Sequence, residues 1–312
     1  NNDYIKYIDI NTEKEALDFI NYFRRNAGLH EFKSNNNLNL SSKNHAKYIE
    51  ETEDISHVET LVSAENYTGE FPNNRTIYAN FNNHYISENL SYGNNNYYTS
   101  IENLFSAIYH RFGFMDITRD LIGIGAENKT FVYNMGNSLL IEQCKKELPI
   151  FSNQYIDTLC KEEGLKVDVV NFENSLYNSF SSKDVEYILF PFNNQTYTPV
   201  LFTEEEPDPL PNYSNTGFPI SIEFNKVKYE GKIQKESFKL YENCNKNEEV
   251  TRIIDMDVSN DPNNIFINTQ FALFPLDVLT NSIEYCAEFI YYDKTEAEKS
   301  EYKVIEWKFE TK

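Results

Sequence analysis

Apolar residues follow two different spacings along the chain. In the first part they recur every three or four positions over residues 12–27, 40–51 and 99–114, which predicts three amphipathic helices. In the last part they alternate with polar residues, and this spacing of two is typical of strands with one buried face. The chain is therefore expected to combine a helix-containing region with an all-β region.

Local signals refine the ends of the first two helices. Thr12 and Glu15 have the spacing of a capping box at the start of the first helix. Gly28 suits the residue that follows the last helical turn. For the second helix, Ser41 or Ser42 is the expected N-cap.

Strand signals begin after the third helix. Residues 121–127 and 130–135 flank the pair Asn128-Lys129, which suits a tight hairpin. A modest helix is expected over residues 153–163, and an extended stretch over residues 186–202. The clearest alternation comes later, at residues 220–224, 238–240 and 305–309. Short strands at such spacing predict a β-sandwich of roughly 100 residues.

An acidic, proline-rich segment separates the two regions. It reads Glu204-Glu205-Glu206-Pro207-Asp208-Pro209-Leu210-Pro211, a composition typical of a stiff spacer. We therefore expect a first domain over residues 1–145, an extension and linker over 146–212, and a sandwich domain over 213–312.

Composition excludes several classes of protein. The chain has 312 residues, a formal net charge of −21 and 15% aromatic residues. The aromatic content argues against disorder. The excess of acids argues against a nucleic-acid-binding protein and against binding to anionic membrane surfaces, because both rest on clustered Lys and Arg. No run of eighteen apolar residues is present, so no transmembrane segment is expected.

The four cysteines divide evenly between the predicted domains. Cys144 and Cys160 lie before the spacer, and Cys244 and Cys286 lie after it. Pairing within each domain is the simplest of the three possible connectivities. Four free thiols, buried as small apolar groups, are the alternative.

No local catalytic motif is present. HExxH, CxxC, the P-loop and the GxSxG elbow are all missing, so candidate chemistry must come from dispersed residues. Three candidates stand out: His57, Glu88 and His110. Arg75 and Arg111 are expected to form salt bridges with buried stems.

Taken together, the motifs of the first 140 residues resemble the CAP family (SCP/PR-1-like: cysteine-rich secretory proteins, antigen 5 and pathogenesis-related 1 proteins). Six motifs occur in the family's order, and the variant resembles exported bacterial members. The region after residue 213 resembles a bacterial Ig-like module. The motifs are Ala16-Leu17-Asp18-Phe19-Ile20-Asn21-Tyr22-Phe23-Arg24-Arg25 with Gly28-Leu29, Asn44-His45-Ala46-Lys47-Tyr48, Ser56-His57, Ser87-Glu88-Asn89-Leu90, Tyr109-His110-Arg111, and the closing pair Ile122-Gly123-Ile124-Gly125 and Val132-Tyr133-Asn134-Met135-Gly136-Asn137.

The resemblance implies an α+β fold, in which a CAP-type αβα sandwich is followed by an Ig-like sandwich. It also implies a cleft lined by two His and two Glu. His57, Glu88 and His110 fall on three of these positions, but the fourth is Ala107. Glu102 is a doubtful substitute because residues five apart share a helix face poorly. Glu59, two residues after His57, is a further candidate for the cleft.

Two interpretations of these residues remain open. His57, His110 and Glu88 could hold Zn²⁺ with an open position for water, although one carboxylate fewer predicts weak or labile zinc binding at most. Otherwise they form a hydrogen-bonded polar cluster that fixes the cleft.

The function expected from the resemblance is that of an exported CAP protein, periplasmic, cell-surface or extracellular, and more of a binding protein than an enzyme. Its cleft would bind a small or lipid-like ligand or a cell-envelope or protein partner. A zinc-dependent hydrolase and a structural surface or adhesion protein are the alternatives. The chain opens at Asn1 without a leader, as expected of a mature or trimmed form.

Overall fold

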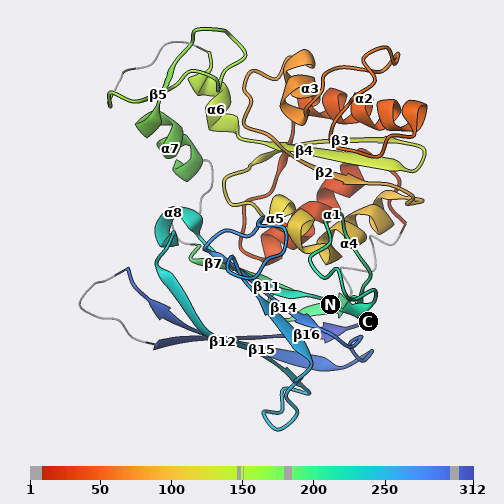
Figure 1. The fold of residues 1–312 in the computed structure, drawn as a ribbon, viewed down its shortest axis with the longest axis vertical. Helices are drawn as coiled ribbons and strands as arrows, with labels where there is room; N and C mark the ends of the chain where they lie inside the picture. Colours follow the sequence, from red (N-terminus) through yellow and green to blue (C-terminus); the bar gives the residue numbers. More distant parts are fainter. Residues whose placement is uncertain (1–8, 146–148, 150, 179–184, 296–301) are drawn as a thin grey trace.

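The computed structural model describes residues 9–145, 149, 151–178, 185–295 and 302–312. The helix-containing part and the strand-rich part pack directly against each other (Figure 1). The fold is a mixture of α and β structure, as the sequence predicts.

The first part has three layers. Its central sheet has the strand order β1-β3-β4-β2. Helices α2 and α3 lie on one face, and α1, α4 and α5 lie on the other, toward the strand-rich part (Figure 1). The elements are α1 (Glu13–Asn26), β1 (Lys33–Ser34), α2 (Asn36–Thr52), α3 (Pro72–Tyr78), β2 (Ser87–Ser91), α4 (Tyr97–Ser106), α5 (Ile108–Phe114), β3 (Leu121–Glu127) and β4 (Thr130–Gly136).

Two glycines let α2 lie close against this sheet. A Cβ atom on Gly123 would come within 2.0 Å of the Leu38 carbonyl carbon, and one on Gly125 within 2.2 Å of the Lys43 nitrogen. No side chain fits at either position, so the spacing between helix and sheet requires glycine there.

The first helix confirms its predicted ends. Thr12 accepts a hydrogen bond from the Glu15 backbone, and the Glu15 side chain accepts one from the Thr12 backbone, which completes the capping box. Gly28 follows the C-cap with φ +83°. The hairpin is also confirmed, with Asn128 at φ 46° between β3 and β4.

The other two helices differ from the prediction. Helix α2 begins several residues earlier, because the Asn35 side chain caps it. Ser41 and Ser42 are therefore not caps; Ser42 instead donates to the Gly123 carbonyl of the sheet. The third predicted helix is split into α4 and α5 by Ala107, whose backbone is extended (φ −77°, ψ 116°).

A small arm follows β4. It contains α6 (Ser138–Gln143), β5 (Tyr155–Ile156), β6 (Val167–Asp168) and α7 (Val169–Asn178). The helix predicted over residues 153–163 is wrong: this stretch holds β5 and a disulfide between Cys144 and Cys160. This stretch lies beside the first part of the chain, where Cys160 forms an isolated antiparallel β-bridge with Asn83.

The strand-rich part is a sandwich of two four-stranded sheets, ordered β13-β14-β11-β7 and β12-β15-β16-β8. Phe224 of one sheet lies 5.8 Å from Phe289 of the other, measured between ring centroids, and Trp307 is buried in the same core. The strands are β7 (Tyr187–Phe190), β8 (Gln195–Thr198), β9 (Leu201–Phe202), β10 (Thr216–Gly217), β11 (Ile220–Phe224), β12 (Ile233–Glu242), β13 (Ile253–Met256), β14 (Gln270–Pro275), β15 (Glu284–Asp293) and β16 (Tyr302–Thr311), with a short helix α8 (Lys226–Tyr229).

The sheets begin earlier in the chain than residue 213, where the predicted sandwich domain begins. β7 pairs with β11, and β8 pairs with β16, so strands on both sides of the acidic spacer share each sheet. The spacer itself is packed, with Glu205 and Leu210 buried. It therefore runs along the folded body and does not separate two independent bodies.

The two parts share a buried interface. Arg111 of α5 donates to the Pro219 carbonyl at 2.7 Å and to the Ser221 hydroxyl at 3.0 Å. Phe112 of the same helix contacts Phe266 at 5.2 Å between ring centroids. Helix α5 is thus one of the elements on which the sandwich docks.

Both predicted disulfides are present: Cys144 pairs with Cys160, and Cys244 pairs with Cys286. In the described part of the chain, no helix combines the length and the apolar character needed to cross a bilayer.

Candidate functional site

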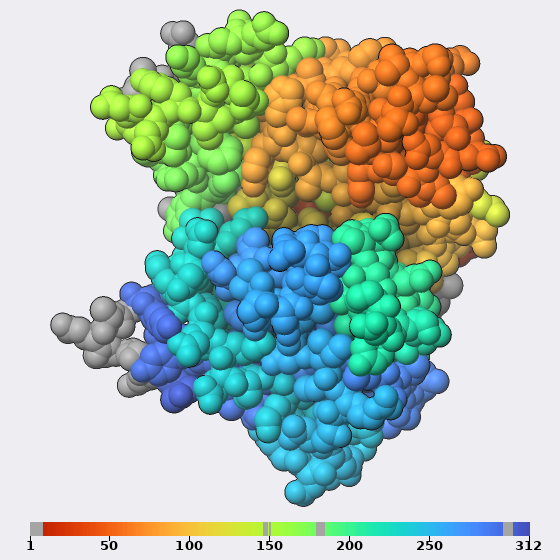
Figure 2. Space-filling view, in the orientation of Figure 1, coloured from red at the N-terminus to blue at the C-terminus, as the bar shows by residue number. Residues whose placement is uncertain are grey.

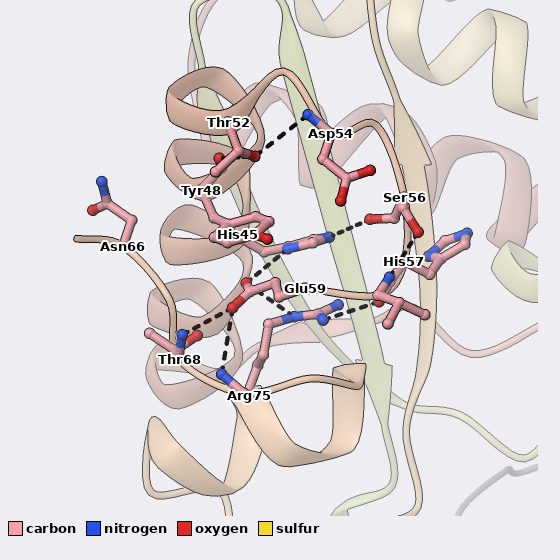
Figure 3. Close-up of polar contacts among 12 residues, drawn as sticks. His45, Tyr48, Thr52, Asp54, Ser56, His57, Glu59, Asn66, Thr68 and Arg75 are labelled. Carbon is pink, nitrogen blue, oxygen red and sulfur yellow. Dashed lines mark hydrogen bonds and ion pairs between the residues drawn. The ribbon is translucent and has the colours of Figure 1, made fainter. Parts of the chain in front are cut away.

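The candidate residues come from four elements of the first part. His57 and Glu59 lie in the loop after α2, and Glu88 lies on β2. A backbone hydrogen bond from Glu59 to the Glu70 carbonyl, 2.8 Å long, folds this loop toward α3. Helix α2 adds His45 and α3 adds Arg75, and these two side chains lie close to His57 and Glu59 (Figure 3). Glu88 contacts His57 and Arg75, so that five charged or titratable side chains gather beside the sheet.

The Glu88 side chain is buried, and both of its oxygens accept hydrogen bonds. It accepts from the two sides of the cluster, at 2.9 Å from His57 Nδ1 and at 2.8 and 3.0 Å from Arg75 Nη2. Burial by itself would raise the pKa of this carboxyl, but the charge of Arg75 and the neighbouring His45 and His57 outweigh it. Together they lower the pKa of Glu88 to about 2, which keeps the carboxylate ionised.

Glu59 is the second buried carboxylate. One oxygen lies 2.9 Å from His45 Nδ1, and the other accepts from the Thr68 backbone N–H at 2.8 Å. The far nitrogen of the His45 ring lies 3.0 Å from the Ser56 carbonyl. His45 thus ties helix α2 to the loop on both sides of His57.

Arg75 lies between the two carboxylates. Its Nε is 3.7 Å from Glu59 Oε1, an ion pair too long for a hydrogen bond, and its Nη1 donates to the His57 carbonyl at 2.9 Å (Figure 3). The Arg75 side chain is fully buried. The expected salt bridge of Arg75 is confirmed, and its guanidinium is the cation of this cluster.

His110 has a different partner. Its Nδ1 lies 2.9 Å from Glu205 Oε1, and the same carboxylate accepts from the Tyr109 backbone N–H at 3.1 Å. Helix α5 begins at Ala107, which has no side chain that could cap it. Glu205 therefore caps α5 from the spacer and orients His110 at the same time.

The structure thus brings His57, Glu59 and Glu88 together and pairs His110 with a residue 95 positions away. Glu102 engages elsewhere: its carboxylate lies 2.6 Å from the Tyr98 hydroxyl and 2.5 Å from Lys312 Nζ, near the end of the described chain. Ala107 is buried and offers no carboxylate.

These residues do not fit a zinc ion. Both oxygens of Glu88 accept from a guanidinium, which repels a metal cation, and the Nδ1 atom of His110 is used by Glu205. Among the described residues, no three His, Cys, Asp or Glu side chains form a group that could hold a metal.

Sequence reasoning missed one partner of the cluster and one distant carboxylate. His45 occurs in the Asn44-His45-Ala46 motif, but its ring was not assigned to the site. The sequence places Glu205 in a stiff spacer, and only its burial reveals its role. Arg111 forms no ion pair in the described chain; it donates to backbone and hydroxyl oxygens and lies 4.8 Å from the Phe190 and Phe218 ring centroids.

Part of the chain is similar to known proteins. Residues 17–135 match the family model of CAP, the cysteine-rich secretory protein family. A crystal structure of an extracellular protein containing an SCP domain, from Bacillus anthracis str. Ames, is similar at 14% sequence identity and a TM-score of 0.36. The match covers 39% of this chain and 39% of that one, so the likeness spans about two fifths of that protein's length. No curated protein sequence matches the chain.

Proposed function

Because residues 17–135 of this chain form a CAP domain, we propose that the protein is an exported binding protein whose His/Glu cluster serves structure and not catalysis. The two disulfides support an oxidising compartment, that is, the periplasm, the cell surface or the extracellular space.

The observation that carries this proposal is the position of Arg75. A zinc hydrolase built on His57, Glu88 and His110 would need all three around one ion. Instead the Arg75 guanidinium neutralises Glu88, and Glu205 engages His110 from the spacer. A buried cluster of this kind fixes the loop that carries His57, as a hydrogen-bonded structural network does.

The accessible member of the cluster is His57. The His57 side chain is 44% exposed, whereas that of Glu88 is 1% exposed. Ile55, two residues earlier in the same loop, is 52% exposed. A half-exposed imidazole and an exposed aliphatic side chain in one loop suit a small or lipid-like ligand, or an apolar contact on a cell-envelope partner.

Zinc calorimetry tests the non-catalytic role. We expect no stoichiometric Zn²⁺ binding in the micromolar range for the wild type, and the same result for His57→Ala and for His110→Ala. Binding of one equivalent that both substitutions abolish, together with a hydrolytic activity that the same substitutions remove, would overturn the proposal in favour of the metal-dependent hydrolase.

A further inference from the structure

A groove of about 660 Å³ lies where the arm, helix α8 and the loop before β14 meet, away from the His/Glu cluster. Helix α7 of the arm stands next to α8 at this junction, and the space-filling view shows a recess between the two parts of the molecule on this face (Figures 1 and 2). Its volume falls in the range of small-molecule sites.

The groove wall is largely aliphatic. Val227, Val258 and Ile267 line it, and each is between 40% and 44% exposed. Leu176 and Phe266 complete the apolar lining. Exposed aliphatic side chains that gather from helix α8 and from the connection between β13 and β14 favour a ligand with a methylene chain.

One wall residue carries a polar atom without a partner. Thr269 is 1% exposed, and its hydroxyl forms no hydrogen bond. Glu223, on the strand beside it, also has one buried oxygen without a partner. Buried hydroxyl groups are nearly always paired, so the Thr269 hydroxyl indicates a group that the groove receives from outside.

The charged residues of the lining indicate the charge of the ligand group that the groove receives. Glu173 and Glu230 line the groove from α7 and from the end of α8, both are exposed, and neither forms an ion pair with a described residue. The single basic residue of the lining, Lys226, is already paired with Asp116 at 2.9 Å. The unpaired charge of the groove is therefore negative.

We propose that this groove binds a free linear aliphatic amine. The methylene chain lies against Val227, Val258 and Ile267, and the ammonium group is attracted by Glu173 and Glu230. An N–H of the ligand donates to the Thr269 hydroxyl. This site is separate from the His/Glu cluster and does not depend on what binds near His57.

Titration of the full chain with octylamine and octanoate, which share a chain length and differ in charge, tests the assignment by ligand-observed NMR or calorimetry. We expect octylamine to bind at least tenfold more tightly than octanoate. Glu173→Gln/Glu230→Gln should weaken octylamine binding by roughly tenfold. The matched control Glu163→Gln/Glu310→Gln changes two exposed acids away from the groove and should change the affinity less than twofold.

Thr269→Val separates a ligand contact from a structural one. Valine keeps the shape of threonine and removes a buried hydroxyl that has no partner, so the melting temperature should rise while octylamine binding weakens. Equal binding of octylamine and octanoate, or no loss in Glu173→Gln/Glu230→Gln, would overturn the proposal. So would tighter binding of the capped tripeptide Val-Lys-Val than of octylamine, because it would assign the groove to a lysine side chain of a protein partner.

Discussion

The two family histidines lie in contrasting surroundings. His57 belongs to a cluster made within the CAP domain, in which Arg75 joins the carboxylates of Glu59 and Glu88. His110 belongs to a contact between the CAP domain and the rest of the chain, through Glu205. One histidine is therefore fixed by its own domain and the other by the docking of a distant segment.

The contact of His110 with Glu205 lies at the point where the predicted third helix is split into α4 and α5. A continuous helix over residues 99–114 would carry its backbone hydrogen bonds through Ala107, but the chain breaks there and starts α5 afresh. The new helix start has unpaired N–H groups, and Glu205 accepts from one of them. The carboxylate partner of His110 is thus supplied by Glu205 of the spacer.

The largest effect is expected at the centre of the internal cluster. Arg75→Ala would leave the buried carboxylates of Glu59 and Glu88 without their cation, which typically costs about 3–5 kcal/mol of unfolding free energy. Denaturant unfolding measures this loss. The control is Arg25→Ala, which removes a surface ion pair with Glu31 whose side chains are about half exposed and should cost under about 1 kcal/mol. Similar losses in the two variants would contradict the central role of Arg75.

The pH dependence of stability should come next in size. The pKa of Glu88 is about 2 in the folded chain and 4.5 as its ordinary value, so the unfolded chain binds the proton more readily. Its stabilisation is therefore fully present above about pH 4.5 and is lost as the pH falls toward 2. At about 1.4 kcal/mol per pKa unit the contribution is roughly 3 kcal/mol.

Glu88→Gln isolates that contribution. The variant should lose less unfolding free energy than the wild type between pH 5 and pH 2, measured by urea unfolding at each pH. Glu162→Gln, an exposed acid in the arm, serves as the control and should follow the wild-type curve. A Glu88→Gln curve parallel to that of the wild type would show that the carboxylate is not held by the cluster.

Glu205→Ala tests the contact between the two parts. It leaves the Tyr109 N–H and the His110 ring without their partner, so we expect a loss of about 1–3 kcal/mol. The exposed neighbour Glu204→Ala should leave stability unchanged within about 0.5 kcal/mol. Faster proteolytic cleavage near residue 205 in Glu205→Ala, but not in Glu204→Ala, would show that the contact holds the spacer down. Equal stability and cleavage of the two variants would contradict it.

The sequence could predict the parts that local signals specify. The Thr12–Glu15 capping box, the hairpin at Asn128 and the pairing of cysteines are all confirmed, because each depends on neighbours in the chain or on a small number of alternatives. The assembly of His57 with Glu88 required the ordered family motifs, since these residues are 31 positions apart.

Other features depend on tertiary packing that no local pattern encodes. Glu205 stands in a run of acids and prolines whose composition is typical of a stiff spacer, and its burial follows from the packing of the spacer and the sandwich against α5. The sequence places β7 and β8 in the extension before the sandwich domain, because their partners, β11 and β16, lie up to 114 residues further along the chain. Long-range pairing of this kind leaves no periodic signal that assigns a strand to its sheet.

The smallest expected effect completes the comparison of the two histidines. His57→Ala leaves Glu88 with both hydrogen bonds from Arg75, and the His57 ring is 44% exposed, so the loss of unfolding free energy should stay under about 1 kcal/mol. His110→Ala, whose ring is 13% exposed, leaves the buried Glu205 carboxylate with only its backbone donor and should cost more, about 1–2 kcal/mol. Paired urea unfolding curves of the two variants measure the order directly. If His57→Ala proved the more costly, the internal cluster would depend on the imidazole as well as on the guanidinium, and the assignment of Arg75 as its central cation would have to be revised.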